Sequence, residues 1–222
     1  MRADAVRRIA ALLLVPPAAF IALAACGIAL GWLAVHAVQP IELGFMQWLA
    51  SHRSLAGLTF VMHRLSDLAG QNWVIAIVVV ASATFLVAGH LRDALAVAAS
   101  AAGMLFLYGV VGSWVSRPRP PVQHLENPGG GSFPSGHVAN STAVYAAILL
   151  SGFLATHLKA VRPALFALAA LLIAGVAVSR MYLGLHYPTD VVAGFLLGLG
   201  WAVVIRRTAD GLAAATHDLE HR

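Results

Sequence analysis

The sequence predicts an all-α membrane protein, and its composition, its mean hydropathy and the spacing of its apolar stretches each indicate this class. The chain has 222 residues, of which 60% are hydrophobic and 10% are charged, and its mean hydropathy is +0.82. Soluble globular chains average about 25% charged residues. A membrane-spanning helix needs about 20 predominantly apolar residues, and six stretches reach or approach that length. We therefore predict one domain over residues 1–222, a single bundle of six membrane-spanning helices.

The predicted spans follow one another with short polar connections. They cover residues 9–38, 73–89, 94–115, 138–156, 164–178 and 191–205. The last two are short and must extend into the polar residues at their ends. Between the first two spans, apolar residues recur at helical spacing from Ile41 to Leu65, which predicts short helices lying on the membrane surface. Residues 208–222 are polar and form a predicted C-terminal extension.

The distribution of Lys and Arg predicts the orientation of the bundle. An even number of spans places both termini on one side, which receives nine basic residues against five on the other. Three of those five, Arg117, Arg119 and Arg180, belong to the motifs described next. Because cytoplasmic loops carry an excess of Lys and Arg, we expect both termini in the cytoplasm and the motifs at the periplasm or cell exterior. The basic residues form no single stripe, so a nucleic-acid partner is not indicated.

Three motifs near the outer ends of predicted spans carry groups that bind and cleave phosphate esters. They are RPRP at 117–120, PSGH at 134–137, and SR at 179–180 followed by His186 and Asp190. A phosphate held beside a membrane needs fixed positive charge and several hydrogen-bond donors. Arg119 and Arg180 offer planar guanidinium groups on the side that the positive-inside bias disfavours. We therefore interpret both arginines as phosphate ligands.

The second motif immediately precedes a predicted span, so Ser135 is expected to be the N-cap of a helix. The backbone N–H groups at such a helix terminus bind anions. Gly136 allows the backbone to approach a phosphate closely, and the glycines at 129–131 leave the preceding loop free to fold over it. We expect Ser135 and Gly136 to contact the phosphate, with His137 in the first turn beside them.

The third motif pairs an imidazole with a carboxylate. His186 and Asp190 are four residues apart, which places them on the same side of a helix if Pro188 lies in its first turn. An aspartate that accepts from one imidazole nitrogen fixes the tautomer and leaves a lone pair on the other nitrogen. His186, His137 and Asp190 are therefore the candidate catalytic residues.

Taken together, the motifs resemble the type-2 phosphatidic acid phosphatase family, whose pattern is Lys-x6-Arg-Pro, then Pro-Ser-Gly-His, then Ser-Arg-x5-His-x3-Asp. The second and third elements are complete here, and the first keeps Arg119 and Pro120. The resemblance covers residues 112–190 and the six-helix layout. One departure is that Gly112 stands where the family has lysine. As a hypothesis, Arg117 supplies the missing positive charge at the phosphate.

The resemblance implies a mechanism. His186 attacks phosphorus and forms a phosphohistidine, Asp190 orients His186, and His137 protonates the leaving oxygen and then activates water. Arg119, Arg180, Ser135 and the Gly136 N–H hold the phosphate oxygens, and no metal or cofactor takes part. The sequence supports that last point independently, because the outer side offers only four scattered acids, Glu42, Asp67, Glu126 and Asp190.

We therefore expect an integral membrane phosphatase that acts on a lipid phosphate or an isoprenoid pyrophosphate at the outer leaflet, with the substrate entering laterally from the membrane lipids. One alternative is a catalytically degenerate scaffold, which Gly112 suggests. Another is a transporter of an anionic lipid or solute. A transporter carries ionisable residues within its spans, and these spans have almost none. The sequence does not predict an oligomeric state.

Overall fold

A computed structural model describes residues 2–53, 56–127 and 129–220, and every regular element in these ranges is helical. The all-α prediction is therefore confirmed. The elements are α1 (Arg2–Leu33), the π-helical turn η1 (Ala34–Val38), α2 (Gln39–Ser51), α3 (Ala56–Asp67), α4 (Gln71–Val87), α5 (Leu91–Val115), α6 (Gly136–Leu149), α7 (Gly152–His157), α8 (Arg162–Tyr182) and α9 (Pro188–Glu220).

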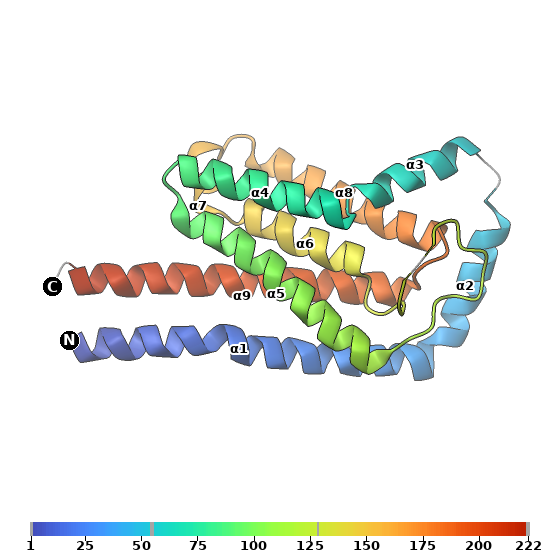
Figure 1. The fold of residues 1–222 in the computed structure, drawn as a ribbon, viewed down its shortest axis with the longest axis horizontal. Helices are drawn as coiled ribbons and strands as arrows, with labels where there is room; N and C mark the ends of the chain where they lie inside the picture. Colours follow the sequence, from blue (N-terminus) through green and yellow to red (C-terminus); the bar gives the residue numbers. More distant parts are fainter. Residues whose placement is uncertain (1, 54–55, 128, 221–222) are drawn as a thin grey trace.

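The long helices run lengthwise through the molecule and separate the chain termini from the motifs. Both termini lie at one end of the bundle, and the loop after α5, the start of α6 and the α8–α9 connection lie at the other (Figure 1). Helix α6 is central and contacts α4, α5, α8 and α9. The motifs, which are distant in sequence, therefore share one end of the bundle.

Close packing of α9 on α6 brings the second and third motifs together. A Cβ added at Gly194 would lie 2.7 Å from the carbonyl oxygen of Ser135, and one at Gly198 would overlap the carbonyl oxygen of Ala139. Small residues spaced four apart allow helix backbones to approach in this way. At the motif end of this contact, the Ser135 N–H donates to the carbonyl oxygen of Asp190 over 2.9 Å.

The surface of the bundle is suited to lipid. Large apolar side chains are exposed along the outer faces of the long helices, among them Leu14, Ile21, Val80, Val87, Phe106 and Leu171. Monomeric soluble proteins rarely expose continuous apolar surface on this scale. The chain is accordingly a membrane-embedded helical protein.

The number of spans remains a prediction. Within the described residues, four helical segments are long and apolar enough to cross a membrane: Val6–Ser51, Leu91–Val115, Arg162–Tyr182 and Pro188–Leu219. Helices α3 and α4, bent by 48° where they meet, qualify only as a pair. The fourth predicted span, 138–156, is interrupted, because α6 ends at Leu149 after 14 residues and Ser151 caps α7. Since α6 is surrounded by other helices, its length is not set by the lipid alone.

The helices expected between the first two spans are present as α2 and α3. Helix α2 continues α1 through η1, so the chain turns away from α1 without a loop (Figure 1). Helix α3 packs on α8. Their location on the membrane surface remains a prediction.

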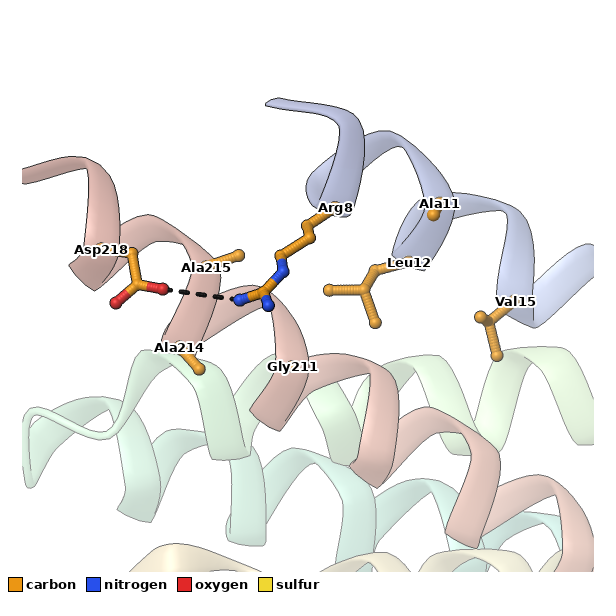
Figure 2. Close-up of a pocket in the computed structure, with 8 residues that line it drawn as sticks. All are labelled: Arg8, Ala11, Leu12, Val15, Gly211, Ala214, Ala215 and Asp218. Atoms are coloured by element: carbon orange, nitrogen blue, oxygen red, sulfur yellow. Dashed lines mark ion pairs between the residues drawn. The ribbon is translucent and has the colours of Figure 1, made fainter. Parts of the chain in front are cut away.

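The C-terminal extension is helical as far as the structure describes it. Helix α9 continues through residue 208 to Glu220 and runs alongside the start of α1. Figure 2 shows the pocket of about 420 Å³ between the two helices, where Arg8 pairs with Asp218 over 3.7 Å and Leu12 faces Gly211. Residues 221 and 222 lie outside the described ranges. As far as residue 220, the extension is therefore part of the bundle and not a separate tail.

Candidate active site

The candidate residues from all three motifs converge at the end of the bundle opposite the chain termini. Arg119 follows α5, His137 is in the first turn of α6, Arg180 is in the last turn of α8, and His186 lies just before α9. His137 interacts electrostatically with His186, Arg180 and Arg119, and His186 interacts with the same two arginines. The two imidazoles and two guanidinium groups therefore form one cluster.

The environment of His186 determines its tautomer. Its side chain is buried, and Nδ1 lies 2.6 Å from the carbonyl oxygen of Ser132. A carbonyl oxygen only accepts, so Nδ1 carries the proton and Nε2 keeps a lone pair. Nε2 lies 3.5 Å from Nη1 of Arg119. Burial lowers the pKa of His186, although Asp190 acts in the opposite direction. The imidazole is therefore neutral near pH 7, with Nε2 available as a nucleophile.

Asp190 lies beside His186 but beyond ordinary hydrogen-bonding distance, whereas the sequence predicted that it accepts directly from the imidazole. Its Oδ2 is 3.7 Å from Nδ1 of His186 and accepts from the Tyr187 N–H over 2.8 Å. Its Oδ1 accepts from Arg117 over 2.6 Å. The short hydrogen bond that orients the imidazole belongs to the Ser132 carbonyl, a group with no side-chain signal in the sequence. Asp190 interacts with the ring electrostatically, from farther away than the Ser132 carbonyl. Helix α9 begins at Pro188, as expected.

Arg119 is held by two backbone carbonyl groups. Nη1 donates to Leu185 over 2.7 Å and Nη2 donates to Gly129 over 2.8 Å. Its Nε is buried and has no hydrogen-bond partner. A buried donor without a partner destabilises the protein, so a ligand oxygen that accepted from this nitrogen would relieve that cost.

Arg180 shows the same pattern with side-chain partners. Its Nη1 donates to Ser66 over 2.6 Å and to Glu126 over 2.7 Å, while Nε is buried without a partner. Glu126 also contacts His63, with 3.2 Å between its Oε1 and the imidazole Nδ1. Burial alone would raise the pKa of Glu126, but Arg180 and its other partners hold it below its usual value. Glu126 is thus a carboxylate that anchors one side of Arg180.

The start of α6 has the expected residues in a different arrangement. Ser135 is the N-cap, as predicted, but its hydroxyl makes no capping hydrogen bond and is buried without a partner. Gly136 is in contact with a neighbouring helix, because a Cβ there would lie 3.0 Å from the ring of Tyr108. Gly136 is therefore required by packing as well as by any approach of a phosphate.

The hypothesis that Arg117 supplies charge to the phosphate does not fit its position. The side chain is fully buried, and its guanidinium lies 3.9 Å from the ring centroid of Tyr187. Its donors are used within the protein, by Gln39, Glu42, Thr189 and Asp190. Because every nitrogen already has an acceptor within the protein, Arg117 joins α2 to the start of α9 rather than presenting its guanidinium to a ligand.

Glu42 is the structural residue that the motif analysis missed. It is 4% exposed, accepts from Arg117 over 2.7 Å, and accepts from the hydroxyl of Thr189 over 2.9 Å. Glu42 lies among apolar residues of α2, and an acid in that setting is a signal for a buried partner. These two hydrogen bonds fix α2 against the start of α9, next to the loop that carries His186.

The acids near the site are poorly suited to binding a metal. Within the described residues, no three His, Cys, Asp or Glu side chains form a group that could hold an ion. Arg117 pairs with Glu42 and Asp190, Arg180 with Glu126, and Arg64 with Asp67. The four acids noted in the sequence are therefore all engaged by arginine.

An apolar cavity opens beside His137. It has a volume of about 350 Å³ and lies between α4, α5 and α6. Its apolar lining includes Val74, Ile75, Val78, Val79 and Leu105, and its polar end carries Gly136 and His137. A mostly apolar cavity with a few polar groups at one end is typical of a ligand site.

Comparisons with known proteins agree with this arrangement. The sequence profile of the PAP2 superfamily matches residues 93–212. A phosphatidylglycerophosphatase B of Bacillus subtilis is 37% identical in an alignment 106 residues long that covers 43% of this chain and 51% of that protein. The chain thus aligns with about half the length of this curated relative.

Two solved structures have the same fold. The crystal structure of a transmembrane PAP2-type phosphatidylglycerolphosphate phosphatase from Bacillus subtilis superposes with a TM-score of 0.72 at 26% identity, covering 97% of this chain and 98% of that one. The structure of LpxE from Aquifex aeolicus superposes with a TM-score of 0.60 at 18% identity, covering 74% of this chain and 94% of that one. Since the family profile covers more than half of the sequence, the chain belongs to the PAP2 superfamily of membrane phosphatases.

Proposed function

We propose that this chain hydrolyses a lipid phosphate ester at the outer end of the bundle through a phosphohistidine intermediate. One observation carries the proposal. Three buried polar atoms without partners, Nε of Arg119, Nε of Arg180 and Oγ of Ser135, belong to the cluster around the unprotonated Nε2 of His186. A phosphate oxyanion would accept from these donors.

The proposed first step transfers the phosphoryl group to the imidazole. Nε2 of His186 attacks phosphorus, the bond between phosphorus and the lipid oxygen breaks, and His137 gives a proton to that oxygen. Burial and the neighbouring Arg180 lower the pKa of His137 to about 3 in the protein alone. The negative charge of the bound phosphate would raise this pKa, so the proposed acid forms only with substrate in place. In the second step, His137 takes a proton from water and the resulting hydroxide attacks phosphorus. The bond between phosphorus and Nε2 then breaks, which releases inorganic phosphate and restores both histidines. The Ser132 carbonyl keeps the nucleophilic tautomer throughout, and Asp190 stabilises the positive charge on the ring.

The donors around His186 would stabilise the charge on the transferred phosphoryl group. Ser66 and Glu126 hold Nη1 of Arg180, which leaves the edge formed by Nε and Nη2 without an acceptor among the described residues. That edge is the one that binds two oxygens of a phosphate at once. The Arg119 side chain, the Ser135 hydroxyl and the Gly136 N–H complete the set. Fixed donors aimed at developing charge are the largest contribution to many enzymatic rates.

The apolar cavity beside His137 supports a lipid substrate. Its position between α4 and α5 would let an acyl or prenyl chain remain in apolar surroundings while the phosphate reaches His186. The relatives named for phosphatidylglycerophosphate point to phospholipid monoesters as the first substrates to test, followed by phosphatidic acid and isoprenoid pyrophosphates. Lateral entry from the outer leaflet is part of the proposal.

We also propose that the reaction needs no metal ion, since the nearby acids are paired with arginines. Activity should survive EDTA. Loss of activity that magnesium restores would contradict this part of the mechanism.

The test is phosphate release by the purified full chain from a panel of phospholipid monoesters, isoprenoid pyrophosphates and soluble phosphate esters. His186→Ala should abolish release and prevent radiolabelled phosphate from being trapped on the acid-quenched protein. His36→Ala is the matched control, because His36 is an exposed histidine whose contacts are with Trp32 of its own helical segment, and it should retain activity. Equal release by the wild-type and His186→Ala proteins would favour a catalytically degenerate scaffold.

A further inference from the structure

The missing lysine of the first motif leads to a residue one helical turn away. Tyr108 precedes Gly112 by four residues on α5, so the two positions lie on the same side of that helix. We propose that the Tyr108 hydroxyl is a phosphate ligand, a neutral hydrogen-bond donor that serves where the family pattern has a lysine. The inference rests on the proposed phosphatase function and deepens it.

The first observation is the contact between Tyr108 and the start of α6. A Cβ built on Gly136 would lie 3.0 Å from Cε2 and 3.1 Å from Cζ of the Tyr108 ring. Cζ carries the hydroxyl, so the ring is pressed against Gly136 along the edge near that group. The Gly136 N–H is one of the proposed phosphate donors. The phenol is therefore beside the oxyanion position rather than only near the active-site end of the bundle.

The second observation is that two cavities meet at Tyr108. One is the apolar cavity that contains His137. The other has a volume of about 370 Å³, contains Gly112, and is lined by small or polar residues, namely Gly109, Ser113, Ser116 and Gly131, besides Phe133 and Tyr108. Tyr108 thus separates the space beside the catalytic histidine from the space that a lysine at position 112 would enter.

The third observation concerns the neighbours of the hydroxyl. Tyr108 interacts electrostatically with both Arg119 and Arg180. Within the described residues it makes no hydrogen bond, unlike Tyr145, whose hydroxyl donates to the Leu68 carbonyl over 3.5 Å. A phenol that interacts with two guanidinium groups and contacts the residue at a helix N-terminus is matched to an anion, since the guanidinium and backbone N–H groups are donors and not acceptors.

The structure permits a direct exchange of one donor for the other. A Cβ at Gly112 would meet only the Phe133 carbonyl oxygen, at 3.4 Å, which is an ordinary contact. A lysine at this position therefore fits, and its flexible stem enters the cavity next to Tyr108. Gly112→Lys should restore what Tyr108→Phe removes.

The experiment measures binding of inorganic phosphate to the detergent-purified chain by titration calorimetry, and kcat/KM on a short-chain phosphatidic acid. Tyr108→Phe keeps the ring on Gly136 and should weaken phosphate binding about tenfold or more, the effect of losing one hydrogen bond to a charged group. The value of kcat/KM should fall by a similar factor. In the double variant Tyr108→Phe/Gly112→Lys, the phosphate affinity and kcat/KM should each be at least fivefold higher than in Tyr108→Phe. Tyr145→Phe, which removes a tyrosine hydroxyl away from the site, should change neither by more than about twofold.

Three results would overturn the inference: no phosphate binding by the wild-type protein, unchanged phosphate binding by Tyr108→Phe, or weakened binding that Gly112→Lys does not improve. Melting temperatures within a few degrees of wild type show that each variant is folded. The binding measurement separates this inference from the proposed function. Phosphate binding that depends on Tyr108 without turnover would refute only the phosphatase, whereas turnover lost in His186→Ala but unchanged in Tyr108→Phe would refute only the role of Tyr108.

Discussion

Replacing Arg117 with alanine tests the distinction between a structural and a ligand-binding arginine. The guanidinium is fully buried and joins the carboxylates of Glu42 and Asp190 at 2.7 and 2.6 Å. Removing it leaves both acids buried without their cation. Breaking a buried ion pair in this way costs about 3–5 kcal/mol, and each kcal/mol shifts the melting temperature of a chain of this size by about 2–4 °C. We expect Arg117→Ala to lower the melting temperature by about 6–20 °C.

The assay is thermal unfolding of the purified protein in one detergent, followed by tryptophan fluorescence, with phosphate affinity measured at a temperature where the variant is folded. Arg64→Ala is the matched control, since the Arg64 side chain is 67% exposed and pairs with Asp67 at 3.2 Å. Exposed pairs contribute about 0–1 kcal/mol, so its melting temperature should fall by less than about 4 °C. Adding Glu42→Gln to Arg117→Ala should recover part of the loss, because it neutralises one stranded carboxylate.

A different outcome would refute this reasoning. If Arg117→Ala melted at the wild-type temperature and bound phosphate much more weakly, Arg117 would be acting as a ligand, as the sequence first suggested. The buried network of Glu42, Asp190 and Arg117 would then contribute little to stability.

Three further predictions follow from other contacts. The pKa of Glu126 is lowered in the folded protein, so its pairing with Arg180 stabilises the fold. This stabilisation is fully present above pH 4.5, the ordinary pKa of Glu, and is lost as the pH falls below that value. The difference in melting temperature between wild type and Glu126→Gln should therefore be constant from pH 7 to 5 and shrink at lower pH. Burial lowers the pKa of His186 from the ordinary histidine value of 6.5, so more than half of the imidazole stays neutral at pH 6.5. The single-turnover rate of phosphoenzyme formation should therefore not halve when pH falls from 7.5 to 6.5, and a halving would contradict the burial argument. Gly198→Ala forces a methyl group onto the Ala139 carbonyl oxygen. Overpacking of this kind lowers the free energy of unfolding by about 1–3 kcal/mol, which should lower the melting temperature by about 2–12 °C. An unchanged melting temperature would show that α6 and α9 separate without cost.

The sequence was sufficient to predict the helical class, the position of the motifs at helix ends and the histidine and arginine side chains that cluster in the candidate site. Hydropathy and helical periodicity are local properties, so they predicted α2 and α3 between the first long helices and Ser135 as the N-cap of α6. Matching a motif pattern also requires only order and spacing. His137 and His186 could therefore be assigned to one site without coordinates.

The tertiary structure alone decided how those residues are held. The role of Arg117 depends on Glu42, which is 75 residues away, and the tautomer of His186 depends on a backbone carbonyl 54 residues away. The contact between Tyr108 and Gly136 joins two different helices. Spacing along the chain carries no information on such distances, because helix packing determines which donor meets which acceptor. For the same reason, the break after α6 could not be read from hydropathy, since a helix enclosed by others does not have to match the thickness of the membrane.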